Sequence, residues 1–153
     1  MANSVCKVLL TEEALPWPMR KLAASTSLRR SANAGAVIDF WGVVRGSEDG
    51  REIEGIEYEA HRKMAEHQLK QIAQQASERF ALQSVVIHHR IGFITPGEPS
   101  LFVRITSRHR AEAFHASQWL VEELKKKVPI WKRPKFKVEN VCRASRNEEA
   151  TVK

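Results

Sequence analysis

HRKMAEHQLKQIAQQASERF, residues 61–80, is the stretch of sequence that decides the fold. Its apolar residues recur at intervals of three and four, a spacing that places them on one face of an α-helix. The residues expected on this buried face are Ala65, Leu69, Ile72, Ala73, Ala76 and Phe80. The polar residues between them would face solvent, so the stretch predicts a half-buried amphipathic helix.

Short β-prone runs lie on both sides of this helix. Ile53–Tyr58 does not keep strict alternation, and Gly55 predicts a β-bulge that resets its register. GSEDG at residues 46–50 has the composition of a turn. The other predicted strands are Val5–Leu10, Ala34–Val44, Gln83–Ile91, Ser100–Thr106 and Ile130–Val138.

Two further helices are predicted. The composition of Met19–Arg30 favours a helix. A second long helix runs to about Lys127, with Ser107 placed to cap its N-terminus and Pro129 placed to stop it. Elements in this order predict a single α+β domain over residues 1–140, with a largely antiparallel sheet and two long helices.

The composition is that of an ordinary globular chain. Of its 153 residues 42% are hydrophobic, which is enough apolar material for one core. The tail, residues 141–153, is polar and lies outside the predicted domain. No apolar run approaches the ~18 residues of a membrane span, and Met1–Leu10 lacks a signal-peptide layout. Cys6 and Cys142 are too few for a disulfide framework or a four-ligand zinc site, so a reduced, cytoplasmic setting is expected.

Positive charge is concentrated in one part of the chain. The net charge is +7, and residues 108–137 hold nine lysines and arginines against three glutamates. Nine minus three leaves +6 within that segment. Such a field attracts an anion, which could be a nucleic acid, an acidic protein surface or a phosphorylated small molecule.

Arg108, His109 and Arg110 stand at the predicted start of the second long helix. The helix dipole favours anions at this position, so three basic side chains there predict a bound anion such as phosphate. The alternative is that these side chains extend into solvent or pair with acids elsewhere.

The other end of the same helix carries Lys125, Lys126 and Lys127. Cations stabilise a helix C-terminus, and a solvated face explains such a run without a function. Lys132 differs because it follows Pro129-Ile130-Trp131, which is expected to fix its direction. A lysine held beside other cations or apolar walls is suited to proton transfer or nucleophilic attack.

Other candidate site residues are few. Arg45 follows the predicted Ala34–Val44 strand, and strand ends are common places for site residues, although a surface arginine is the alternative. Adjacent His88 and His89 would point to opposite faces of a strand, and the histidines lack metal-ligand spacing. No metal site is therefore predicted, and no P-loop, nucleophile elbow or dinucleotide glycine fingerprint is present.

Five motifs follow one another along the chain: GAVIDFWGVVRG (35–46), YEAHRKMAE (58–66), HHRIGFITPGE (88–98), SRHRAEAFHAS (107–117) and LKKKVPIWKR (124–133). In this order and spacing they resemble the MoaE family, the large catalytic subunits of molybdopterin synthase. The resemblance covers residues 34–133. Each motif is weak alone, but five in register make a specific match.

The resemblance implies a fold and an activity. The fold is of the α/β hammerhead type, and two large subunits form a central homodimer. A small ubiquitin-like subunit at each end, completing a heterotetramer, inserts its thiocarboxylated C-terminus into the large subunit. This sulfurtransferase adds two sulfurs to cyclic pyranopterin monophosphate, which makes the molybdopterin dithiolene in molybdenum cofactor biosynthesis. No metal or organic cofactor is implied, and the partners include neither a membrane nor nucleic acid.

The resemblance also implies residue roles. Arg45, His109 and Arg110 match positions that hold the substrate phosphate and pterin. Lys125 matches the main catalytic lysine, and Lys132 matches the lysine that assists it. Four further positions are expected to line the same pocket: Val43, Val44, Arg133 and Pro134.

The chain departs from the family pattern after the last motif. Pro134 stands where the family usually has Glu, so a carboxylate that could orient Lys132 is absent there. KFKVENVCRASRN replaces a stretch with Gly and Trp, and leaves Arg143 or Arg146 as the arginine that a partner subunit would contribute. Two interpretations compete with the enzyme: a paralogue that binds the small subunit without turnover, and a basic nucleic-acid-binding module using residues 108–137.

Overall fold

The computed structural model describes residues 4–16 and 32–139 of the chain. The helix predicted at Met19–Arg30 lies outside the described residues. So does the predicted tail, which contains Cys142, Arg143 and Arg146. No helix in the described ranges is long and apolar enough to cross a membrane.

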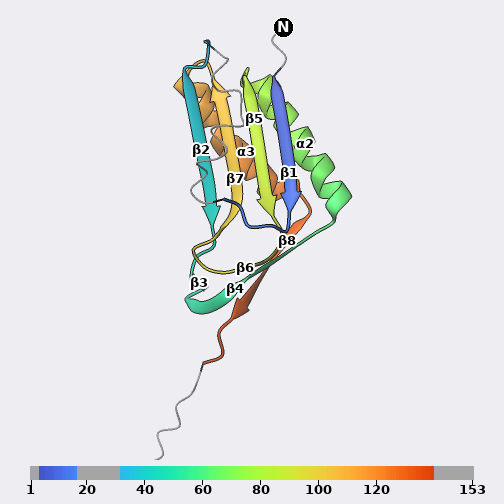
Figure 1. Ribbon diagram of the computed structural model, residues 1–153, viewed down its shortest axis with the longest axis vertical. Helices are drawn as coiled ribbons and strands as arrows, with labels where there is room; N and C mark the ends of the chain where they lie inside the picture. The colour runs from blue at the N-terminus through green and yellow to red at the C-terminus, as the bar shows by residue number, and fades with distance from the viewer. Residues whose placement is uncertain (1–3, 17–31, 140–153) are drawn as a thin grey trace, which may run out of the picture.

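A four-stranded sheet, here called the main sheet, forms the larger layer (Figure 1). Its strand order is β1-β5-β7-β2. β1 runs parallel to β5, whereas β5–β7 and β7–β2 are antiparallel, so the largely antiparallel sheet is confirmed. The strands are β1 (Val5–Thr11), β2 (Ala36–Val43), β5 (Ser84–Arg90) and β7 (Pro99–Ser107).

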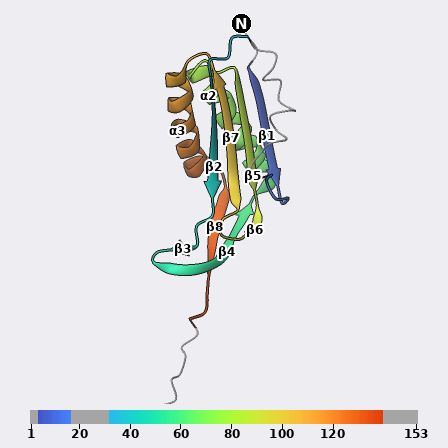
Figure 2. The same cartoon turned by 60° about the vertical axis from the view of Figure 1, so that its left-hand side comes forward.

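Two helices cover one face of the main sheet: α2 (Arg62–Arg79) and α3 (Arg110–Lys127). α2 packs against β1 and β5, and α3 packs against β2 and β7 (Figures 1 and 2). Five of the six residues predicted on the buried face of the first helix are buried in α2, and Phe80 is partly buried against Trp119 of α3. The spacing of three and four in the sequence therefore gave the correct buried face.

A smaller sheet, here called the second sheet, lies beyond one end of the main sheet (Figure 1). In it β4 pairs with β3, β6 and β8. The strands are β3 (Ser47–Glu48), β4 (Arg51–Ala60), β6 (Gly92–Ile94) and β8 (Ile130–Phe136). The sequence did not predict β6, because a strand of three residues that begins with a positive-φ glycine, Gly92, is too short a pattern to recognise.

The β-bulge predicted at Gly55 is confirmed, because the register of β4 against β8 shifts between Ile53 and Gly55. A Cβ atom at this glycine would lie 2.6 Å from the carbonyl oxygen of Ile94 and 2.6 Å from the ring of Phe93. Only glycine therefore allows β6 to approach β4 this closely.

The start of α3 differs from the prediction. His109, not Ser107, is the N-cap residue, and Arg110 is the first residue of the helix. Ser107 is the last residue of β7, where its buried hydroxyl donates to the carbonyl oxygen of His109. The serine therefore stabilises the turn before the helix and does not cap it. The other end is as predicted: α3 stops at Lys127, two residues before Pro129 ends the turn into β8.

Candidate active site

The GSEDG turn is a hairpin between β3 and β4. Asp49 and Gly50 have φ angles of 50° and 75°, the pair of positive values that a two-residue type I′ turn requires. The turn sets Glu48 opposite Arg51, and the backbone N–H of Ile53 donates to Gly46 at 3.0 Å. The Asp-Gly pair in the sequence thus fixes where the side chain of Glu48 lies.

Glu48 joins two of the predicted site residues. Its Oε2 lies 3.8 Å from Nη2 of Arg45, and its Oε1 accepts a hydrogen bond from Nζ of Lys132. The Glu48 side chain is 14% exposed, against 76% for Arg45 and 44% for Lys132. The hydrogen bond from Lys132 is the main cause that lowers the pKa of the Glu48 carboxyl below its ordinary value. A charged carboxylate therefore lies between two basic side chains that come from distant parts of the chain.

Lys132 and Arg133 leave β8 on opposite faces, as neighbours in a strand do. Nη2 of Arg133 lies 3.2 Å from Oε2 of Glu59, away from Glu48. Pro134 is on the same face of the strand as Lys132, half-buried opposite Ile56. The structure therefore brings Arg45 and Lys132 together but does not add Arg133 to them.

The end of β2 supports this arrangement. Val43 is the last residue of the strand and is 41% exposed. Val44 is buried in an apolar cluster with Ile53, Ile56 and Ile94. Its N–H donates to Glu98 at 3.0 Å, and its carbonyl accepts from Gly97 at 2.8 Å. Val44 therefore anchors the strand end from which Arg45 extends, and its own side chain is part of the core.

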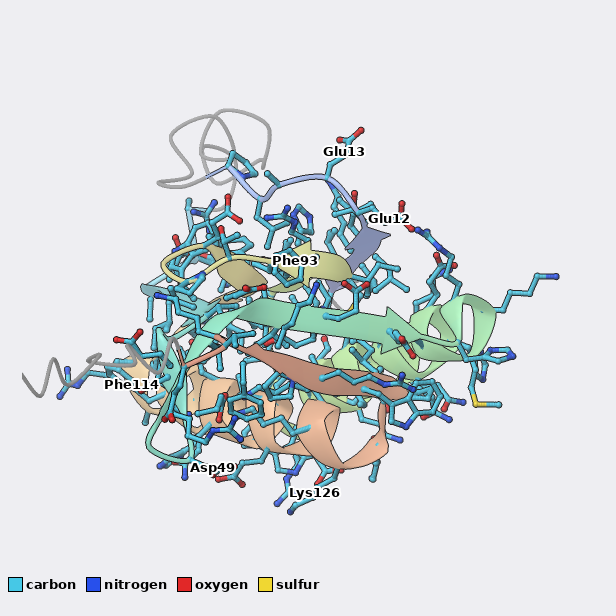
Figure 3. All side chains as sticks on the ribbon, turned by 90° about the horizontal axis from the view of Figure 1, so that it is seen from below. Glu12, Glu13, Asp49, Phe93, Phe114 and Lys126 are labelled. Carbon is cyan, nitrogen blue, oxygen red and sulfur yellow. The ribbon has the colours of Figure 1, made fainter. Side chains whose placement is uncertain are left out.

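The last turns of α3 lie on the same side of the second sheet as the β3–β4 hairpin. Figure 3 shows the hairpin tip at Asp49 and Lys126 of α3 on that side, and Figure 2 gives the same arrangement. Lys125 is exposed and makes no ion pair with any residue in 4–16 or 32–139. Lys127, in contrast, pairs with Glu123 at 2.6 Å, one turn earlier in the helix. The amine of Lys125 is therefore the more available of the two.

His109 and Arg110 lie at the opposite end of α3. Arg110 precedes Lys125 by 15 positions in one continuous helix, which corresponds to about 22 Å along the helix axis. Both His109 and Arg110 are exposed. Within a single protomer the structure therefore divides the predicted site into two groups, one at each end of α3.

The histidines do not form a metal site. No group of three or more residues that could hold a metal ion occurs among the residues that the structure describes. His88 and His89 lie on opposite faces of β5, as predicted, with His89 buried and its ring edge against Tyr58 at 5.7 Å between centroids. Burial is the main cause that lowers the pKa of His89 to about 4, so its ring is neutral at physiological pH.

A shallow depression opens elsewhere, between the ends of β1 and β4 and the start of α2. Its charged lining consists of Glu12, Glu57, Glu59, His61, Arg62 and Lys63. None of the predicted site residues lines it, and its charges are partly paired, for example Glu12 with Arg62 at 3.1 Å. The candidate site therefore remains the Arg45, Glu48 and Lys132 cluster with the adjacent end of α3.

Comparison with known proteins shows the family to which this chain belongs. Residues 16–127 match the family model described as MoaE protein. The chain belongs to the MoaE family. Among its MoaE relatives, the molybdopterin synthase catalytic subunit of Pyrococcus abyssi is 40% identical over 107 residues, which cover 70% of this chain and 72% of that protein. The corresponding subunit of Pseudomonas aeruginosa is 41% identical over 104 residues, 68% of this chain and 69% of that protein.

The MoaE fold is also found among solved structures. The crystal structure of molybdopterin synthase from Staphylococcus aureus matches with a TM-score of 0.73 at 30% identity, over 86% of this chain and 90% of that chain. The expected α+β fold is thereby confirmed.

One site residue was missed by the sequence reasoning. Glu48 lies within GSEDG, which was interpreted only as a turn. The signal was present, because a two-residue Asp-Gly hairpin predicts that the residue before it is paired with the next strand. No local pattern in the sequence shows that Lys132, 84 residues further on, contacts that carboxylate.

Proposed function

We propose that this protein is the catalytic subunit of molybdopterin synthase. It transfers sulfur from the thiocarboxylated C-terminus of a small ubiquitin-like subunit to cyclic pyranopterin monophosphate. The observation that carries the proposal is the convergence of Arg45 and Lys132 on one side of the second sheet, beside the end of α3 that bears Lys125, in a chain of the MoaE family.

Each transfer breaks the C–S bond at the C-terminal carbonyl of the small subunit and forms a C–S bond at a side-chain carbon of the pterin substrate. A C–O bond at that carbon breaks at the same time, and its oxygen leaves with the phosphate or as water. Water returns the carbonyl as a carboxylate. Lys125 supplies an amine for proton transfer or for a transient acyl link to that carbonyl. Lys132 and Arg45 supply fixed positive charge toward the anionic groups of the substrate and the developing negative charge. No metal or organic cofactor is needed for these steps.

The proposed assembly contains two large subunits, with a small subunit at each end. The division of the site along α3 supports it, because about 22 Å separate Arg110 from Lys125 in one protomer. In a symmetric dimer, His109 and Arg110 of each protomer complete the site built around Lys125 of the other. An arginine of the tail, Arg143 or Arg146, is proposed to reach the neighbouring site in the same way. The proposed location is the cytoplasm.

The test of the activity is dithiolene formation in a reconstituted mixture. It contains this protein, the thiocarboxylated small subunit and cyclic pyranopterin monophosphate. We expect product from the unchanged protein and a loss of at least about 100-fold from Lys125→Ala, because the reacting amine is removed. Lys126→Ala is the matched control: it removes the next, equally exposed lysine of the same run and should keep full activity.

Two results would contradict the proposal. Equal losses from the two lysine variants would assign the effect to the charge of the run and not to Lys125. No product from the unchanged protein, with the small subunit still bound, would favour a paralogue without turnover, for which Pro134 in place of the family Glu is the motivating observation.

The dimeric site has its own test. Arg110→Ala and Lys125→Ala chains are co-expressed with different tags, and the mixed dimer is purified through both. One of its two sites then carries both changes and the other carries neither, so we expect about half of the unchanged activity, although each parent dimer is nearly inactive. A mixed dimer as inactive as its parents would place both residues in the site of a single protomer.

A further inference from the structure

We propose that Glu48 is a positioning residue of the sulfur-transfer site, whose carboxylate holds the ammonium of Lys132 on one side of β8, near the guanidinium of Arg45. The inference rests on the proposed function, because it assigns Glu48 a role through Lys132. Glu48 itself is not expected to touch the reacting atoms.

Three elements meet at this carboxylate. Arg45 follows β2, Glu48 lies in β3 and Lys132 lies in β8. Each carboxylate oxygen of Glu48 lies near a different cation. Oε1 accepts a hydrogen bond from Nζ of Lys132, and Oε2 lies 3.8 Å from Nη2 of Arg45. Without the Glu48 carboxylate between them, the positive charges of Lys132 and Arg45 would repel each other. Glu48 therefore makes their approach favourable.

The carboxylate is the fixed member of the group. It is the least exposed of the three side chains, at 14%, and its backbone is held by the Asp49-Gly50 turn and the pairing with Arg51. Lysine has a long side chain that samples many rotamers when it is unrestrained. A hydrogen bond to a fixed carboxylate selects one of these arrangements, and a preorganised charge is what electrostatic catalysis requires.

No other acid can replace Glu48 at this point. Within residues 4–16 and 32–139, it is the one carboxylate that contacts Lys132. Pro134, the next residue on the same face of β8, has no carboxylate to offer. The acid that orients Lys132 in this chain thus comes from the β3–β4 hairpin and not from β8 itself.

The second sheet provides a matched control pair. Glu52 of β4 contacts Lys137 at 3.4 Å, but both side chains are more than half exposed, at 75% and 56%. An exposed pair of this kind contributes little and fixes little. Removing the charge of Glu52 therefore changes the total charge of the molecule by the same amount as removing that of Glu48, at a place without a role in the site.

The experiment compares Glu48→Gln with Glu52→Gln in the reconstituted synthase. We expect Glu48→Gln to lower kcat about tenfold, because Lys132 is no longer held. KM for the pterin and Kd for the small subunit should change less than twofold, and Glu52→Gln should match the unchanged protein. In a Lys132→Ala background, Glu48→Gln should have no further effect, because it acts through that lysine.

A second readout does not depend on turnover. In ¹⁵N NMR the Nζ–H₃ signal of Lys132, protected by its hydrogen bond, should be observed in the unchanged protein and lost in Glu48→Gln but not in Glu52→Gln. Unchanged kcat in Glu48→Gln, an additive loss in the double variant, or a lower pterin KM would each overturn the positioning role; the last would show that Glu48 competes with the substrate. If the unchanged protein forms no product while the NMR difference is present, the proposed function fails and the ion pair stands.

Discussion

The main sheet and the second sheet use the same strand alternation for different purposes. In the main sheet, alternate residues of β5 and β7 are buried against α2 and α3, and Val85, Ile87, Val103 and Ile105 are at most 1% exposed. In the second sheet, ion pairs connect the strands: Lys132 with Glu48, Arg133 with Glu59 and Lys137 with Glu52. The first layer contains the larger apolar core, and the second adds charged pairs between its strands to a smaller apolar cluster.

The two layers also place titratable groups in different environments. The main sheet keeps His89 buried, neutral and packed against Tyr58. The second sheet lowers the pKa of the Glu48 carboxyl through a hydrogen bond from Lys132, which keeps that group charged. A change of pH should therefore act on stability through the main sheet before it acts on the ion pairs of the second sheet.

The largest expected effect is the loss of stability on mild acidification. Burial lowers the pKa of His89 to about 4, below the ordinary value of 6.5 that the unfolded chain restores. Well above pH 6.5 the ring is neutral in both states and has no effect. As the pH falls from 6.5 toward 4, the unfolded state binds the proton and the folded state does not. The free energy of unfolding should therefore fall by about 2 kcal/mol between pH 7 and pH 5 from this group.

Urea denaturation at pH 7, 6 and 5 measures this loss, with His89→Gln as the variant that removes the titration. The His89→Gln protein is less stable at pH 7 but should lose about 2 kcal/mol less on acidification. His88 also has a lowered pKa because of partial burial, so His88→Gln should flatten the same curve to a smaller extent. Glu48, Glu98 and Glu123 have lowered pKa values, and their contribution disappears only at more acidic pH. An unchanged slope in His89→Gln would contradict the assignment.

The two layers were not equally predictable from sequence. The period of α2 and the apolar strands of the main sheet are local patterns, because a buried face repeats along its own element. The second sheet is held by pairings between residues far apart, such as Glu48 with Lys132, and no local pattern contains them. The same limit applies to His109, Arg110 and Lys125, which the motifs predict in one pocket although they lie at opposite ends of α3 in one protomer.

Even where residues of the second sheet were identified correctly, their orientation depended on register. Lys132 and Arg133 are neighbours in the sequence, and both were expected in one pocket. Strand alternation sends Arg133 to Glu59 and leaves Lys132 facing Glu48. Val44 and Arg45 differ in the same way, because the Val44 side chain is buried in the core and that of Arg45 is exposed. Which of two neighbouring side chains is buried determines which one faces the site, and burial is known only from the three-dimensional structure.

The smallest expected effect on stability comes from the hairpin turn of the second sheet. Gly50 has a φ angle of 75°, and a Cβ atom there would meet nothing within 4 Å, so any cost of Gly50→Ala arises from the backbone alone. We expect the free energy of unfolding to fall by about 1 kcal/mol. Dithiolene formation should fall more than this stability change suggests, because the turn carries Glu48. Gly50→Asn, which tolerates positive φ, should restore most of both quantities.

Gly46 is the control within the same loop. A Cβ atom there also meets nothing within 4 Å, and its φ angle is not in the left-handed region, so Gly46→Ala should leave stability and activity unchanged. Thermal unfolding and the reconstituted assay, run on the three variants, separate a backbone effect from a general intolerance of the loop. Equal losses in Gly46→Ala and Gly50→Ala would show that the turn geometry does not set the position of Glu48. A loss of stability in Gly50→Ala with full activity would mean that the site tolerates a displaced hairpin. The exact position of Glu48 relative to Lys132 would then not limit the activity.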